Sequence, residues 1–163
     1  MKNYKLRDYQ QEASDSIVHE WEETASTLLL MATGGGKTTV CMDVIERYGG
    51  KALIVAHREE LIIQARDTII SGTGLACEVE MAEWSAHSNG LFQHDVLVAT
   101  IQTLNARNGD RKRMGKFKPE DYGLMMIDEA HHATSQSYRN VINYFAQNHK
   151  LRIVGPTATA DRF

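Results

Sequence analysis

The segment from Leu28 to Thr39 constrains this chain more than any other, because it joins an apolar run to a glycine-rich loop and a helix start. It reads Leu-Leu-Leu-Met-Ala-Thr-Gly-Gly-Gly-Lys-Thr-Thr. The apolar run is too short to cross a membrane and is typical of a buried strand. Glycines permit tight turns and let backbone N–H groups come close to a polyphosphate, and the positive end of the next helix adds attraction. The segment therefore predicts a phosphate-binding loop.

Two residues of this loop have specific expected roles. Lys37 is expected to reach the β- and γ-phosphates, and the Thr38 hydroxyl is expected to bind Mg²⁺. One position departs from the pattern G-x-x-x-x-G-K-[ST], because Met31 stands where that pattern has its first glycine. Glycine-rich linkers that bind nothing share this composition, so the prediction needs a second motif. The expected nucleotide-binding residues of the loop are Thr33, Gly34, Gly35, Gly36, Lys37, Thr38 and Thr39.

Length and composition indicate one globular domain with a full core. The chain has 163 residues, of which 42% are apolar and 24% are charged. A net charge of −3 gives no overall electrostatic case for nucleic acid, so any such contact must be local. Cys41 and Cys77 are too few for a disulfide framework, and Cys41 falls on the apolar side of a predicted helix. With no signal peptide or membrane-length run, we expect a cytoplasmic protein without a membrane partner.

Apolar runs alternate with amphipathic segments along the chain. Strands are predicted at 28–31, 52–56, 95–99, 123–127 and 151–154, with a possible short strand at 77–81. Helices are predicted at 8–21, 37–48, 135–147, through 61–69 and, briefly, through 101–104. Continuous apolar strands between helices predict an α/β fold, with a mostly parallel sheet and helices on both faces. Ligand-binding groups should then gather at the carboxyl edge of the strands.

A second motif places Asp128 and Glu129 at such a strand end, directly after Leu124-Met-Met-Ile127. Two adjacent carboxylates repel each other, so burying both is costly unless a cation lies there. Mg²⁺ takes oxygen ligands, which suits Asp128. Glu129 could then orient and deprotonate the water that attacks a γ-phosphate. Taken alone, the pair could equally be a solvated acidic loop; the phosphate loop on the same rim argues against that reading.

Together the two motifs resemble motifs I and II of superfamily 2 helicases of the DEAH-box type, as Ala32 to Thr38 and Asp128-Glu-Ala-His131. With Asp128-Glu-Ala-His-His132 included, the motifs look like those of the helicase domains of type III restriction enzymes and similar repair translocases. Four further segments resemble the family's adenine-reading Q motif, motif Ia, a later strand-end motif that touches nucleic acid, and motif III. These segments are Leu6 to Gln10, Ala56 to Leu61, Val98 to Thr103 and Thr157 to Thr159.

This resemblance implies a RecA-like P-loop NTPase that uses ATP and Mg²⁺. It implies that residues 1–163 form a single first lobe, working with a second RecA-like lobe in the same or another chain that supplies an arginine to the ATP site. The other implied partner is single- or double-stranded nucleic acid, with DNA favoured. The implied site residues are Lys37, Asp128, Glu129 and His131 for catalysis, Thr38 and Asp128 for Mg²⁺, Arg7 and Gln10 for the base, His57, Arg58, Thr100, Gln102 and Thr103 for nucleic acid, and Thr157, Ala158 and Thr159 for coupling.

Several alternatives stay open at this point. The chain could be a lone ATP-binding switch that gates a partner without unwinding anything, or, less in keeping with the motifs, a phosphotransferase. Gln10 could be an exposed helix-start residue, and His57 and Arg58 could be helix-cap residues. The basic segment 107–118 is expected to be mobile and could either touch nucleic acid or simply be solvated. Zinc at His131 and His132 is disfavoured, because adjacent histidines point apart and no third ligand is spaced to join them.

Overall fold

Six parallel strands form the central sheet of this computed structural model, which describes residues 3–87, 94–130 and 133–158. Their order across the sheet is β1-β8-β7-β2-β4-β3. All six predicted strands are present, and the prediction of a parallel sheet is confirmed. Their bounds are β1 (Ser26–Leu30), β2 (Ala52–Ala56), β3 (Cys77–Glu80), β4 (Val96–Thr100), β7 (Leu124–Ile127) and β8 (Arg152–Thr157).

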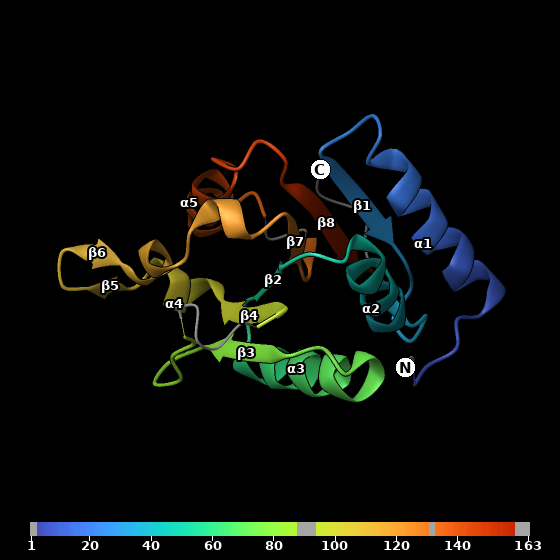
Figure 1. Cartoon of the computed structure of the whole chain (residues 1–163), viewed down its shortest axis with the longest axis horizontal. Helices are drawn as coiled ribbons and strands as arrows, with labels where there is room; N and C mark the ends of the chain where they lie inside the picture. Colours follow the sequence, from blue (N-terminus) through green and yellow to red (C-terminus); the bar gives the residue numbers. More distant parts are fainter. Residues whose placement is uncertain (1–2, 88–93, 131–132, 159–163) are drawn as a thin grey trace.

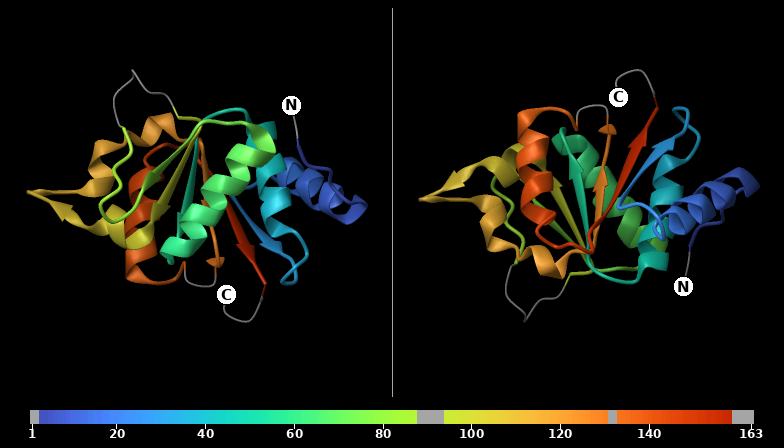
Figure 2. Two further views of the ribbon diagram at one scale, coloured as in Figure 1. Left: turned by 90° about the horizontal axis from the view of Figure 1, so that it is seen from below. Right: turned by 90° about the horizontal axis from the view of Figure 1, so that it is seen from above.

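Helices cover both faces of the sheet, as predicted (Figures 1 and 2). Helices α1, α2 and α3 pack on one face, and α4 and α5 pack on the other. Gly49 and Gly74, in the left-handed conformation, end α2 and α3 near the predicted positions. The bounds are α1 (Asp8–Glu20), α2 (Lys37–Tyr48), α3 (Glu59–Thr73), α4 (Ile101–Asn105) and α5 (Gln136–Phe145). In the described part of the chain, no helix is long and apolar enough to cross a membrane.

Strand β1 differs from the prediction of a fully buried strand. It lies at the edge of the sheet, with β8 as its neighbour. Leu29 is buried beneath α1 and α2, but Leu28 and Leu30 point to the other face and are 43% and 54% exposed. An apolar run cannot by itself distinguish an edge strand from a central one, because that position depends on pairing with β8, more than a hundred residues away.

The buried face of α1 also differs from the predicted one. The spacing of four shared by Tyr9, Ala13, Ile17 and Trp21 predicts that they form the inner face of this helix, yet Tyr9 is 44% exposed. The buried residues are Gln10, Ser14 and Ile17, so two polar side chains face inward. The buried face of α1 is therefore shifted by about one residue from the face that the apolar spacing predicts, because Gln10 and Ser14 find hydrogen-bond partners elsewhere in the fold.

The partners of Ser14 come from α2. The Ser14 hydroxyl donates to the buried Asp43 carboxylate over 2.7 Å. Arg47 donates to the Ser14 oxygen over 3.1 Å and pairs with Asp15 over 2.7 Å. The hydroxyl of Tyr4 donates to the Glu46 carboxylate of α2 and lies 3.4 Å from Asp43 Oδ1, and burial together with these two carboxylates raises the pKa of Tyr4. This polar cluster fastens α1 to α2.

The basic segment that was expected to be a mobile loop contains regular structure. Strands β5 (Arg107–Asn108) and β6 (Arg111–Lys112) form a short antiparallel hairpin. Gly109, at φ 62°, occupies the first central position of its two-residue turn, which suits a type II′ turn. Two 3₁₀ turns follow, η1 (Arg113–Lys116) and η2 (Pro119–Asp121). The hairpin projects from the end of the molecule opposite α1 (Figure 2).

Candidate nucleotide and nucleic-acid site

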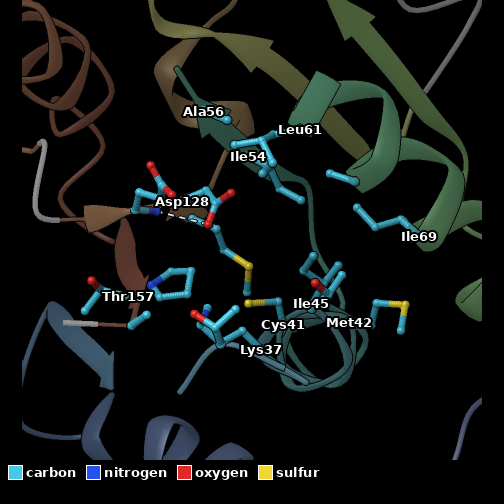
Figure 3. Close-up of a pocket in the computed structure, with 17 residues that line it drawn as sticks. Lys37, Cys41, Met42, Ile45, Ile54, Ala56, Leu61, Ile69, Asp128 and Thr157 are labelled. Atoms are coloured by element: carbon cyan, nitrogen blue, oxygen red, sulfur yellow. Dashed lines mark hydrogen bonds between the residues drawn. The ribbon is translucent and has the colours of Figure 1, made fainter. Parts of the chain in front are cut away.

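A cavity of about 530 Å³ opens at the carboxyl edge of β1, β8 and β7. Because parallel strands end at one edge, residues that follow different strands converge on it. Figure 3 shows Lys37, Asp128 and Thr157 gathered at one end of this cavity. The predicted site residues that line it are Thr33, Lys37, Thr38, Asp128, Glu129, Thr157 and Ala158.

The glycine loop is held in place by its own backbone and by β8. The Gly35 N–H donates to the Ala32 carbonyl over 2.9 Å, and the Met31 N–H donates to Thr157 over 3.0 Å. The Lys37 ammonium donates to the Met31 carbonyl over 3.1 Å, so the lysine folds back across the loop. An anion placed in the loop would offer that ammonium a stronger, charge-assisted partner. Met31, the departure from the pattern, packs its side chain against Gly35.

Gln10 braces this loop from α1. Its amide oxygen accepts from the Arg7 N–H over 2.9 Å, and its amide nitrogen donates to the Gly35 carbonyl over 3.0 Å. A Cβ atom on Gly36 would lie 2.1 Å from that nitrogen, and Gly36 has a φ of 85°, so both contact and conformation require glycine. The alternative of an exposed helix-start residue is therefore wrong, since Gln10 is buried. One donor and one acceptor site of the amide are left for a base.

Tyr9 is the residue here that sequence reasoning missed. Its hydroxyl donates to the Gly35 carbonyl over 3.1 Å, and Arg7 donates to the same hydroxyl over 3.4 Å. The exposed ring thus lies beside the loop, where it offers an aromatic surface for stacking. Its place between Arg7 and Gln10 was the available signal, but helical spacing assigned it to the core.

Asp128 and Glu129 extend the line of β7 into the cavity. The Asp128 N–H donates to the Val55 carbonyl over 2.9 Å, which continues the β2–β7 pairing. The Glu129 N–H donates to Asp128 Oδ1 over 3.0 Å. Glu129 adopts a φ of 51°, a left-handed conformation that is uncommon for residues with a side chain and clusters at functional sites. The strained turn presents both carboxylates on one side.

The polar end of the cavity has the donor chemistry of a magnesium site. Thr38, Asp128 and Glu129 contribute a hydroxyl and two carboxylates, and hard divalent cations prefer oxygen ligands. Two adjacent carboxylates and one lysine ammonium line this part of the cavity, so a net negative charge remains. A divalent cation would offset that charge. The residues fit Mg²⁺. Among the described residues no group of three or more His, Cys, Asp or Glu side chains could hold a metal ion.

The other end of the cavity is apolar. It runs between α2 and α3, where Figure 3 shows Met42, Ile45 and Ile69. Cys41 lies at the boundary, and burial, reinforced by Asp128, raises the pKa of its thiol to about 12. The thiol is therefore protonated at neutral pH, which agrees with the expectation of a small hydrophobic residue.

The predicted nucleic-acid residues divide into exposed and buried sets. His57 and Arg58 follow β2 and are exposed. Gln102 lies beside them in the first turn of α4, with its amide nitrogen 2.8 Å from His57 Nδ1. Thr100 and Thr103, by contrast, are only 3% and 7% exposed, and their hydroxyls bond each other over 2.7 Å at the start of α4. Direct phosphate contact by these two hydroxyls is therefore not supported; they position the helix.

Two predicted site residues, His131 and Thr159, lie outside the residues that the structure describes. Thr157 and Ala158 are described. Thr157 is buried at the end of β8, and its carbonyl accepts from the Met31 N–H. The candidate coupling segment is thus bonded directly to the start of the phosphate loop. Gly155, two residues before Thr157, lets the loop after β7 pack over β8, since a Cβ there would lie 2.7 Å from that of Ala130.

A phosphate loop after one edge strand and paired carboxylates after a central strand define a P-loop nucleotide-binding domain of RecA-like fold. The profile of the family described as "Type III restriction enzyme, res subunit" matches residues 3–162. The chain therefore belongs to this family, which agrees with the resemblance read from the motifs.

Two curated relatives illustrate the family. The chain is 34% identical over 172 residues to "Putative ATP-dependent helicase IRC3" of Saccharomyces cerevisiae, covering 96% of this chain and 24% of the relative. It is 28% identical over 162 residues to the DNA 3'-5' helicase XPB of Mycobacterium tuberculosis, covering 99% and 28%. The chain thus spans about a quarter of the length of these relatives.

Among solved structures, the helicase domain of Hef from Pyrococcus furiosus is similar, with a TM-score of 0.77 and 27% identity. The alignment covers 97% of this chain and 34% of that one. The type ISP restriction-modification enzyme LlaGI, solved with a DNA substrate mimic, has a TM-score of 0.71 at 21% identity, covering 98% and 18%. At that identity the second likeness concerns the fold alone.

Proposed function

We propose that this chain is the first motor lobe of a superfamily 2 helicase or translocase of the DEAH-box type, which binds ATP with Mg²⁺. Joined to a second RecA-like lobe, it would couple ATP hydrolysis to movement on nucleic acid, with DNA favoured. The observation that carries this proposal is the convergence of Lys37, Thr38, Asp128 and Glu129 on one cavity. The helicase names of the relatives add support, and one of them is named as a DNA helicase.

In this proposal each side chain has one task. Backbone N–H groups of the glycine loop and the Lys37 ammonium hold the phosphates. Thr38 and Asp128 hold the Mg²⁺ ion, which neutralises charge on the phosphates when bound. Glu129 accepts a proton from the attacking water as the oxygen bonds to the γ-phosphorus, and ADP leaves. Gln10 and Tyr9 contact the base.

The exposed residues predicted to contact nucleic acid favour a motor over a lone ATP-binding switch. His57, Arg58 and Gln102 form an exposed polar group on the rim that carries the ATP cavity. Such groups suit phosphate oxygens of a nucleic-acid strand, which position the strand without reading its sequence. A switch that only gates a partner protein needs no such group.

A second lobe is part of the proposal because the cavity lacks a cation for the transition state. Among the described residues that line it, Lys37 is the one cationic side chain. The chain covers only 24% and 28% of the length of these helicase relatives, which is in keeping with a motor that has further parts.

Binding of Mg-ATP tests the nucleotide half of this proposal. Lys37→Ala should lower ATP affinity about tenfold to a hundredfold, because one charge-assisted hydrogen bond is worth ~1.5–3 kcal/mol. Calorimetric titration measures this change, with Lys150→Ala, an exposed lysine between α5 and β8, as the matched control. Equal ATP affinity in Lys37→Ala and the parent would refute the phosphate-loop assignment.

A further inference from the structure

A second cavity, of about 490 Å³, lies between the β5–β6 hairpin and the loop after β3. None of its lining residues is acidic, and five are cationic. These residues are Ser85, Arg107, Asn108, Arg111, Lys112, Arg113, Gly115 and Lys116. We call it the hairpin cavity. No motif of the nucleotide site reaches it.

Two of its cations are built into the fold. Arg113 Nε donates to Glu80 Oε1 over 2.7 Å, and Lys116 Nζ lies 2.5 Å from Glu80 Oε2. The Glu80 side chain is fully buried at the end of β3, so it needs these cations as partners. Arg113 also donates to the carbonyls of Ala82 and Trp84 over 2.5 and 3.1 Å. The hairpin cavity is therefore anchored to the edge of the main sheet.

The remaining cations carry uncompensated charge. Within the described part of the chain, Arg107 and Arg111 are exposed and make no hydrogen bond or ion pair through their side chains. Lys112 donates to a neutral acceptor, Asn105 Oδ1, over 3.3 Å. Asp110, the one acid of the hairpin, lies in its turn and does not line the cavity. A short hairpin thus holds three cations close together, and an anion with several charges would relieve their repulsion.

The hairpin cavity is joined to the proposed strand contacts by α4. Lys112 bonds Asn105 at the end of this helix, and Gln102 at its start bonds His57. Thr103 accepts from the Ala82 N–H, whose carbonyl accepts from Arg113. Arg107 lies five positions after Gln102, so their Cα atoms are at most about 18 Å apart. That length corresponds to about five base pairs of duplex.

From this arrangement we infer that the hairpin cavity binds the phosphodiester backbone of the nucleic acid that the lobe moves along. It would add a second contact to that of His57, Arg58 and Gln102. The inference rests on the proposed function for the identity of the partner. Guanidinium groups suit the shape and charge of phosphate, and the binding would depend on salt and not on sequence. A free polyphosphate shares this chemistry, so the test must separate the two sources.

The test compares Arg107→Gln/Arg111→Gln with the parent chain. Fluorescence anisotropy measures the affinity for a labelled 12-base-pair duplex and the matching single strand across a range of salt concentrations. The plot of log affinity against log salt should lose about 0.9 of slope per lost phosphate contact, or about two in all. Affinity near 0.1 M salt should fall about tenfold to a hundredfold. Both arginines are exposed, so the variant should keep its melting temperature and its ATP affinity.

Two control variants locate the effect. Lys5→Gln/Lys150→Gln removes the same charge at exposed positions away from the hairpin, and it should leave the salt slope unchanged. His57→Ala/Arg58→Ala removes the rim contact. If that variant weakens nucleic-acid binding while Arg107→Gln/Arg111→Gln does not, the hairpin inference is overturned and the motor proposal stands. If only the hairpin variant weakens binding, the hairpin inference stands and the rim assignment is wrong.

Inorganic tripolyphosphate separates the two phosphate sources. Tripolyphosphate titrated against the bound duplex should compete only weakly, because it cannot span the hairpin cavity and the rim. Loss of tripolyphosphate binding in Arg107→Gln/Arg111→Gln, with no change in affinity for duplex and single strand, would overturn the inference in favour of a small-anion site.

Discussion

Glu129 combines a left-handed backbone with a position next to Asp128, and its substitution separates the two proposed carboxylate roles. Glu129→Gln keeps the size of the side chain and removes its ability to accept a proton, so ATP affinity should stay within about twofold while the residual hydrolysis is lost. Asp128→Ala removes the proposed ligand of Mg²⁺ and should weaken ATP binding only when Mg²⁺ is present. Titrations with and without chelator measure this, and equal loss of binding in both variants would contradict the division of roles.

At the scale of single residues, the sequence predicted which side chains gather at the rim but not what each one contacts. Lys37, Asp128 and Thr157 could be placed because each follows a recognisable strand. The contacts of Gln10 with Arg7 and Gly35 could not, because they depend on how α1 lies against the loop. The burial of Thr103 depends on a loop 21 residues earlier, whose Ala82 N–H donates to the Thr103 hydroxyl oxygen.

At the scale of helices and strands, the polar cluster between α1 and α2 can be tested by removing its buried carboxylate. Asp43→Ala leaves the Ser14 hydroxyl without its buried acceptor and removes one ion-pair partner of Arg47. It should lower the free energy of unfolding by about 3 kcal/mol. For a domain of this size that corresponds to a fall in melting temperature of roughly 6–12 °C. Thermal unfolding followed by circular dichroism measures it.

Asp15→Ala is the matched control for the cluster. It removes the exposed partner of Arg47, and an exposed ion pair contributes at most about 1 kcal/mol. Because Gln10 lies on α1 and braces the glycine loop, Asp43→Ala should also weaken ATP binding, whereas Asp15→Ala should not. Equal melting temperatures for the two variants would show that the buried cluster does not fasten the helices.

Element types and approximate bounds followed from periodicity, whereas the environment of each element did not. The strands β2, β4 and β7 are continuous apolar runs that are buried throughout, as expected for the centre of a parallel sheet. The hairpin of β5 and β6 gave no such signal, since its strands have two residues each and are entirely polar. The burial of Glu80 was equally hidden, because its partners Arg113 and Lys116 lie more than thirty residues later.

For the molecule as a whole, we expect binding of Mg-ATP without efficient turnover. The residues proposed to bind the phosphates and Mg²⁺ lie on one rim with Glu129, but no arginine is among the described residues that line the cavity. In related phosphoryl transfer, an arginine at the γ-phosphate is worth ~10³ to 10⁵ in rate. Phosphate release by this chain alone, with and without single-stranded DNA, is the measurement. Turnover of ~1 s⁻¹ or faster, the ordinary enzyme range, stimulated by DNA and without a partner, would contradict the proposal. Addition of a second lobe carrying such an arginine should restore DNA-stimulated ATP hydrolysis.

The edge position of β1 affects how the fold opens locally. This strand has β8 as its neighbour and leaves Leu28 and Leu30 in solvent, whereas β2 is paired on both sides and buried. Amide hydrogens of β1 should therefore exchange with deuterium faster than those of β2, and similar protection would contradict this. Because the glycine loop continues directly from β1, bound ATP should slow exchange along the strand. Deuterium uptake by β1 would then report occupancy of the loop from a segment that itself touches no phosphate.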